Sequence, residues 1–157
     1  MFSYNIVAYT TYLFYYHLMF ERCLYFNINA LTRAVNRTWD EAFAEFDLSP
    51  SHAYLLRLIL SSPGLTPKQI TKELKLEKST VTRFLDALEK KGFLQRKKNT
   101  SGDAREQAIH TTKKSDKIAS QLEAKGEILY QKMISNIGKS ELTTLVKELR
   151  KIESQIN

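Results

Sequence analysis

The sequence predicts a mainly α-helical domain that carries one small β-hairpin. Apolar residues recur at three- and four-residue spacing over most of the chain, which is the period of an amphipathic helix. Only 5 Gly and 3 Pro occur among the 157 residues, too few for a fold built from tight turns. One short stretch after Gly92 changes to the two-residue period of a strand. The length suits a single domain with its own hydrophobic core.

Residues 1–18 differ from everything that follows. The first 20 residues carry no charge, and 10 of the 17 aromatic residues fall within residues 1–26. A membrane anchor, a native extension that packs in a dimer, and a non-native or optional extension before Met19 are the alternatives. Polar residues dilute the stretch as a membrane span, and a signal peptide would need basic residues before Arg22. We favour the non-native or optional extension, expect no membrane partner, and treat residues 19–157 as the single domain.

A long amphipathic helix is predicted over residues 21–46. One apolar stripe runs along it at helical spacing, made of Leu24, Ile28, Leu31, Val35, Trp39, Ala42 and Phe46. A helix of this length in a small domain often packs against a partner beyond its own core. The pair Asp47-Leu48 ends it.

Three shorter helices follow, and two of them form a helix-turn-helix. Ser49-Pro50 and Thr66-Pro67 are helix starts, with the hydroxyl residue as N-cap and proline at the first helical position. The second helix covers residues 68–74, and residues 75–77 form a turn. The third covers residues 78–91, with Val81, Leu85 and Leu88 on its core face. Gly92 stands where a C-terminal glycine cap is expected.

A β-hairpin and two helices complete the domain. Residues 93–98 and 106–110 alternate as strands, with a polar turn at residues 99–103. A helix opens at Thr112 and is broken by Gly138, and the last helix begins near Ser140. Helix, helix-turn-helix and hairpin in this order predict a winged helix, with a binding lobe at residues 48–111 between helical flanks at 21–46 and 112–156.

The positive charge is concentrated in that lobe. The chain holds 24 Lys and Arg against 17 Asp and Glu, a net charge of +7. Residues 65–115 hold 13 basic and 6 acidic residues and therefore carry the whole excess, since residues 1–64 sum to −1 and residues 116–157 to +1. A basic segment between near-neutral flanks indicates a polyanion partner, here double-stranded DNA.

The residue types in the lobe suit B-DNA, whose major groove admits an α-helix. The predicted recognition helix begins with hydrogen-bonding side chains, and Arg83 can fork onto guanine. Thr66 and Lys68 open the preceding helix, where free amides can hold a phosphate. The basic strand supplies sequence-independent attraction, and Arg105 near the hairpin tip suits a narrow minor groove. The predicted contact set is Thr66, Lys68, Lys78, Ser79, Thr80, Thr82, Arg83, Arg96, Lys97, Lys98 and Arg105.

The runs Gly64–Ile70 and Ser79–Gly92, with the wing motif Asp103-x-Arg105, resemble the MarR/SlyA-type transcriptional regulators. The resemblance covers the chain from about Cys23 onward. It implies an obligate homodimer, with the first helix and the last two intertwined, and a cytoplasmic prokaryotic regulator. It also implies a palindromic operator and repression relieved by a small ligand or an oxidant. In this frame Asp103 holds the wing arginine, and Arg105 is the minor-groove finger.

The sequence departs from the family pattern at three places, one of which is a wing tip with fewer basic residues than many relatives have. Glu77 stands where an Asp or Ser usually caps the recognition helix, and it is a poorer N-cap. Thr111-Thr112 and Ser115 replace the usual Leu-Thr and glycine at the junction between the wing and the next helix.

The sequence also contains candidate residues for an effector site and for other functions. By the family frame Trp39, Phe43 and Tyr54 are candidate ligand-pocket residues, with ordinary core packing as the alternative. Cys23, the sole cysteine, is a candidate redox sensor or simple packing filler. A winged helix that binds protein would need an apolar recognition helix. We expect no enzyme, no cofactor and no metal site, because catalytic motifs are missing and His17, His52 and His110 lack ligand spacing.

Overall fold

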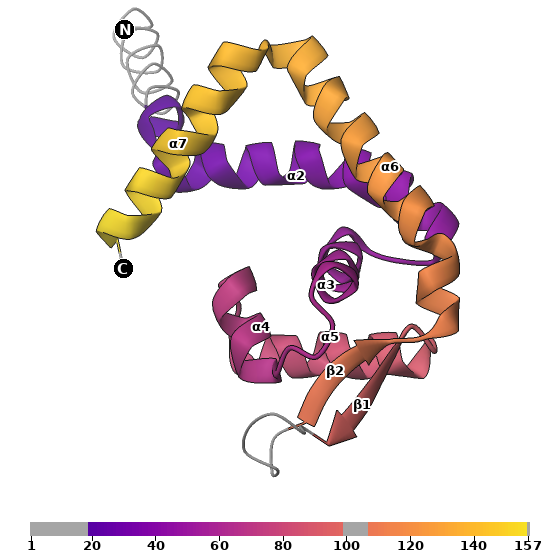
Figure 1. Cartoon of the computed structure of the whole chain (residues 1–157). Helices are drawn as coiled ribbons and strands as arrows, with labels where there is room; N and C mark the ends of the chain where they lie inside the picture. The colour runs from indigo at the N-terminus through magenta and orange to yellow at the C-terminus, as the bar shows by residue number, and fades with distance from the viewer. Residues whose placement is uncertain (1–18, 99–106, 157) are drawn as a thin grey trace, which may run out of the picture. The chain divides into compact units, whose positions relative to one another are not determined.

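The structure is a computed structural model that describes residues 19–98 and 107–156. The predicted extension at residues 1–18 and the hairpin tip lie outside the described residues. The chain divides into two compact units, Met1–Trp39 and Asp40–Asn157. Figure 1 shows the element order along the chain.

The first unit holds most of the predicted long helix. Residues 19–22 are helical, Cys23 is not, and helix α2 (Leu24–Phe43) then continues into the second unit. The Asn27 side chain braces the break, because its Nδ2 donates to the carbonyl oxygens of Phe20 (2.9 Å), Glu21 (3.2 Å) and Cys23 (2.9 Å). The single helix predicted over residues 21–46 is therefore interrupted near its start. It also tightens at its end into the 3-10 helix η1 (Ala44–Phe46).

The second unit contains the remaining elements in the predicted order. They are α3 (Pro50–Ser61), α4 (Pro67–Leu74), α5 (Lys78–Lys90), β1 (Leu94–Lys98), β2 (Gln107–Thr111), α6 (Lys113–Ile137) and α7 (Lys139–Ile156). The predicted caps are confirmed: Ser49 accepts the backbone N–H of His52, and Thr66 accepts that of Gln69. Gly92 follows α5 with φ +77°, a conformation that glycine adopts without steric penalty.

The lobe at residues 48–111 has its own hydrophobic core. Helix α3 contributes one fully buried face, and α4, α5 and the hairpin each add buried side chains. Helix α3 lies beside α5 and the hairpin (Figure 1). Burial of such side chains is worth roughly 1.5–3 kcal/mol each and is the main force that assembles the lobe. The fully buried residues of the lobe are Ala53, Leu55, Leu56, Ile59, Ile70, Val81, Leu88 and Ile109.

The hairpin is fixed to the helix-turn-helix through its second strand. β1 and β2 pair antiparallel in a register that runs from Leu94 opposite Thr111 to Lys98 opposite Gln107. On the other edge of β2, the Ile109 carbonyl accepts the Gly64 N–H at 2.8 Å, and the Ile109 N–H donates to the Leu65 carbonyl at 2.9 Å. The chain segment before α4 therefore extends the small sheet and holds the wing beside the helices.

Helices α6 and α7 leave the lobe at a hydrogen-bonded junction. The Thr112 hydroxyl donates to the Gly92 carbonyl at 2.7 Å, and the buried Ser115 hydroxyl donates to the Phe93 carbonyl. Ser115, which stands where the family usually has glycine, therefore closes this junction together with Thr112 through side-chain hydroxyls. The two helices meet at Gly138 at a sharp angle (Figure 1). Within residues 19–98 and 107–156, no helix is both long enough and apolar enough to cross a membrane.

Candidate nucleic-acid interface

Helix α5 presents a polar face built from the predicted recognition residues. Lys78, Ser79, Thr82 and Arg83 are exposed and Thr80 is partly exposed, while Val81, Leu85 and Leu88 are buried on the opposite side. The spacing of the three buried residues puts them on one helical stripe, so the remaining positions of the first two turns point outward. The structure therefore gathers all five of these predicted contact residues on one exposed surface.

Two internal bonds set the resting conformation of this face. The Thr82 hydroxyl donates to the carbonyl of Lys78 at 2.9 Å, and Arg83 Nη2 donates to the Thr80 hydroxyl at 3.3 Å. The Glu77 side chain makes no capping hydrogen bond, which confirms that it is a poor N-cap. Because the Arg83 guanidinium forms only this long bond to a neutral hydroxyl among the described residues, it keeps donors available for a ligand.

Thr66 and Lys68 have different surroundings at the start of α4. Thr66 is only 7% exposed, and its hydroxyl takes part in a capping box with Gln69. The Thr66 N–H donates to Gln69 Oε1 at 2.8 Å, so both groups of Thr66 are used within the chain. Lys68 is exposed on the same turn. The main role of Thr66 is therefore to cap α4, and Lys68 is the accessible cation at the start of this helix.

The basic strand β1 separates into two groups. Lys97 and Lys98 are exposed toward the end of the strand. Arg96 is instead half-buried and paired with two carboxylates of α5: its Nη2 lies 2.5 Å from Asp86 Oδ1, and its Nη1 donates to Glu89 Oε2. The remaining wing candidates, Asp103 and Arg105, lie outside the described residues.

Other basic residues of the lobe serve internal structure. Lys91 Nζ lies 2.9 Å from Asp47 Oδ2, and the hydrogen bond and charge of Lys91 lower the pKa of the Asp47 carboxyl from its usual value. Lys114 Nζ donates to the Lys91 carbonyl at 2.7 Å and sits 4.2 Å from the centre of the Phe93 ring. These lysines tie η1, the end of α5 and the start of α6 together.

Sequence reasoning missed a second ionic contact, between α3 and α6. Arg57 Nε and Nη2 donate to the two carboxylate oxygens of Glu123 at 2.8 and 2.6 Å. The bridge raises the pKa of the Arg57 guanidinium and lowers that of the Glu123 carboxyl, in both cases chiefly through this hydrogen bonding. Gly126 leaves room for it, since a Cβ there would lie 2.5 Å from Arg57 Nη1. An interior helical glycine was the one available signal.

The predicted ligand residues do not share one environment. Phe43 is fully buried, and its ring meets that of Tyr54 edge-on with centroids 6.4 Å apart. Tyr54 is 45% exposed, and the Arg57 guanidinium lies 5.5 Å from its ring centroid. Trp39 belongs to the first unit. Phe43 thus behaves as core, which is the alternative considered for this set, and Tyr54 is its accessible member in the second unit.

Cys23 stands at the helix break of the first unit as a free, partly exposed thiol. Its Sγ accepts the backbone N–H of Phe26 at 3.5 Å. No group of three or more His, Cys, Asp or Glu residues in the described part of the chain is placed to hold a metal ion.

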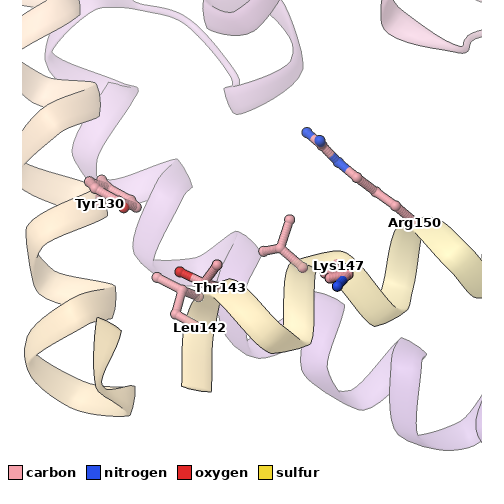
Figure 2. A pocket seen from close by; sticks show the side chains of 6 residues that line it. Tyr130, Leu142, Thr143, Lys147 and Arg150 are labelled. Carbon is pink, nitrogen blue, oxygen red and sulfur yellow. The ribbon is translucent and has the colours of Figure 1, made fainter. Parts of the chain in front are cut away.

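A groove of about 360 Å³ lies between α6 and α7 (Figure 2). Tyr130 of α6 faces it from one side, and α7 supplies Leu142, Thr143 and Val146 along the floor. Lys147 and Arg150 stand at its outer end. The groove is mainly apolar, and it is far along the chain from the polar face of α5.

A helix-turn-helix followed by a basic hairpin, with a polar face on its second helix, defines a winged helix-turn-helix protein. The sequence profile of the MarR family matches residues 48–106, which is most of the lobe. An uncharacterized HTH-type transcriptional regulator of Bacillus subtilis, YwoH, is 30% identical over 105 residues, spanning 67% of this chain and 75% of that protein. The chain belongs to the MarR family of transcriptional regulators, and members of this family are regulators rather than enzymes.

Solved structures agree with this assignment. Reduced MarR from E. coli is 27% identical with a TM-score of 0.65, over 83% of this chain and 96% of that one. A mutant E. coli MarR complexed with operator DNA is 26% identical with a TM-score of 0.71, over 80% and 89%. MepR of S. aureus, solved as a DNA complex, is 20% identical with a TM-score of 0.75, over 87% and 99%, and supports the fold alone.

Proposed function

We propose that this chain binds double-stranded DNA in a sequence-specific manner through α5 and the hairpin. The observation that carries the proposal is the exposed row of hydrogen-bonding side chains at the start of α5, over a buried apolar stripe. Ser79, Thr80, Thr82 and Arg83 are the base-reading set, with Lys78 beside them. Lys68, Lys97 and Lys98 contact phosphates, and Thr66 shapes the α4 start. The complex of a mutant E. coli MarR with operator DNA supports this use of the fold.

The wing tip completes the proposed interface. Arg105 inserts into a minor groove beside the site read by α5, and Asp103 orients it. Both roles rest on the resemblance of the Asp-x-Arg motif, because these residues lie outside the described part of the chain. A narrow A·T-rich minor groove attracts an arginine through its enhanced negative potential.

The protein acts as a homodimer on a palindromic operator. Helix α7 contains no buried residue, and Leu145 and Val146 are 39% and 42% exposed on it. Val146 also lines the apolar groove between α6 and α7, and exposed apolar patches of this kind often mark interaction surfaces. A two-fold dimer places two copies of α5 on successive major-groove turns and so requires a pseudo-palindromic site.

The regulatory output is repression, relieved by a small ligand, in the cytoplasm of a prokaryotic cell. Family resemblance supports this part of the proposal. Tyr54 is the accessible aromatic residue of the predicted ligand set, and Trp39 stays in that set as a sequence prediction. A panel of small aromatic compounds should raise the melting temperature of the protein and release the DNA. Tyr54→Ala should weaken both effects, and a panel with no effect on either would contradict ligand control.

The interface is tested by selecting fragments of genomic DNA and measuring mobility shifts at several salt concentrations. Arg83→Ala should relax specificity at one base pair of each half-site, by about 1–3 kcal/mol. Lys97→Ala should weaken binding to all sequences alike and flatten the salt slope by about one unit. Identical behaviour of the two variants would overturn the assignment of roles. A wild-type protein with no sequence-specific shift at moderate salt would overturn DNA recognition itself.

A further inference from the structure

We propose that Arg96 is a positioning residue, which locks the wing onto the recognition helix, rather than a phosphate contact. This inference rests on the proposed DNA binding and changes the role of one member of the basic strand. The proposal follows from the two carboxylates that pair with Arg96. Among the described residues, no carboxylate pairs with Lys97 or Lys98.

The two-residue period of β1 decides which way each side chain faces. Leu94 is 3% exposed and packs into the core beside α5, so Arg96, two residues on, projects from the same face. Lys97 projects from the opposite face and is exposed. The register agrees, because Arg96 lies opposite the fully buried Ile109. Two neighbouring basic residues on one strand therefore meet different surroundings.

The partners of Arg96 are arranged for a fork. Asp86 and Glu89 are three residues apart on α5 and therefore on one helix face. Each accepts a hydrogen bond from a different terminal nitrogen of Arg96, with Asp86 Oδ1 at 2.5 Å. The guanidinium presents its donors in a fixed planar geometry, so holding two carboxylates fixes the direction of the side chain. The contact joins β1 to the helix that carries the base-reading residues.

The charges of the cluster argue against a phosphate contact. Arg96, Asp86 and Glu89 together carry a net charge of −1, so the cluster adds no attraction for DNA. Its use for phosphate would require Arg96 to leave two carboxylates, which would then remain unpaired near a polyanion. Lys97 and Lys98 would not have to leave a carboxylate partner in order to contact a phosphate.

The wing needs contacts outside the hairpin to hold it in place, because a two-stranded hairpin is only marginally stable by itself. Recognition requires α5 and the wing to meet neighbouring grooves at the same time. A wing that moves relative to α5 must be ordered on binding, and this ordering lowers affinity. The fork holds the wing beside α5 before DNA arrives. Its loss therefore acts through the wing contacts, not through a missing charge.

The test is a double-mutant cycle on the full chain, read as Kd for the selected operator duplex and for an unrelated duplex. Arg96→Gln should weaken operator binding about tenfold. The pair Asp86→Asn with Glu89→Gln removes two negative charges near the DNA and should nevertheless weaken operator binding by a similar factor. Adding Arg96→Gln to that pair should change Kd by less than about twofold, because the fork is already broken.

Lys97→Gln is the matched control, with the same charge loss on the next residue of the strand. Its effect should be the same in the wild-type and acid-neutralised backgrounds, with a salt slope lowered by about 0.9. Binding to the unrelated duplex should respond to Lys97→Gln more than to Arg96→Gln. Circular dichroism melts establish that every variant is folded at the assay temperature.

Two results would overturn the inference. Tighter operator binding by the acid-neutralised pair would show that the carboxylates only repel DNA. A full additional loss on adding Arg96→Gln to that pair, with the salt slope lowered as for Lys97→Gln, would show a direct phosphate contact. If the wild type binds the operator and Lys97→Gln lowers the slope, the proposed function stands whatever Arg96 does. A wild type that binds no duplex would overturn both.

Discussion

Apolar side chains are buried to different extents in the lobe (residues 48–111) and in α7, the last helix of the C-terminal arm (helices α6 and α7). In the lobe, side chains such as Leu56, Ile59 and Leu88 are fully buried within the same chain. In the arm, α7 buries none of its residues, and Ile156 is 71% exposed. The lobe therefore has a core of its own, whereas the exposed apolar side chains of α7 are what the proposed homodimer would cover with a second chain.

The sharpest way to break this contrast is to charge the arm. Leu145→Asp combined with Val146→Asp places two carboxylates on the apolar face of α7, where a partner chain would have to bury them unpaired. The variant should sediment as a folded monomer and bind its operator at least about 100-fold more weakly, because the two half-sites are no longer linked. Thr144→Asp, on the exposed polar side, is the control. A variant that stays dimeric would refute the assignment of this face.

Truncating one side chain in each region compares their sources of stability. Leu88→Ala leaves a cavity in a fully buried site and should lower the free energy of unfolding by about 2–5 kcal/mol at any protein concentration. Leu145→Ala should have an effect that varies with protein concentration, because it weakens association. Urea unfolding at two concentrations about tenfold apart measures both. A concentration-dependent loss for Leu88→Ala alone would reverse the account.

The lobe should also become less stable in mild acid because of His52. Its Nδ1 is 2.7 Å from the Ser49 hydroxyl, its ring packs against Phe84, and its buried Nε2 has no hydrogen-bond partner among the described residues. Burial first, and the charge of Lys91 second, lower the pKa of the imidazole below its usual 6.5.

The unfolded chain therefore binds the proton more readily, and stability should fall as the pH drops below about 6.5, by at most about 1.4 kcal/mol per pH unit. His52→Gln should flatten this part of the profile of unfolding free energy against pH. An unchanged profile would show that other groups set it.

The smallest expected effect comes from the bridge between lobe and arm. Glu123 is largely exposed, so Glu123→Gln should lower stability by less than about 1 kcal/mol. The hydrogen bond from Arg57 lowers the pKa of Glu123 below its usual 4.5. The contribution should be complete above that pH and vanish as the pH falls through the lowered pKa. Unfolding between about pH 3 and 7 measures it, with Glu127→Gln as control. Equal profiles for the two variants would exclude the bridge.

The sequence predicts most of the fold because its signals are local. Ser49, Thr66 and Gly92 stand within a few residues of the helix ends that they cap, and Val81 faces inward by simple periodicity. The break at Cys23 escaped prediction, because the apolar stripe begins only at Leu24 and the Asn27 brace is a side-chain contact.

The sequence predicts which residues belong to the candidate site better than it predicts what each residue does there. Ser79, Thr82 and Arg83 are exposed where expected, because their positions depend on α5 alone. The roles of Arg96 and Thr66 depend on neighbours: the first on the packing of β1 against α5, the second on a local capping box. The Arg57–Glu123 bridge joins residues 66 positions apart, and no local pattern reveals such a pair.

The most direct test of the central claim is the stoichiometry of the protein–DNA complex. Sedimentation equilibrium of the full chain with a selected operator duplex should give two chains per duplex at about physiological salt, with dissociation as salt rises. Two chains per duplex would support a DNA-binding dimer built from a self-sufficient lobe and a shared arm. A folded monomer bound singly, or a dimer that binds no duplex, would contradict it.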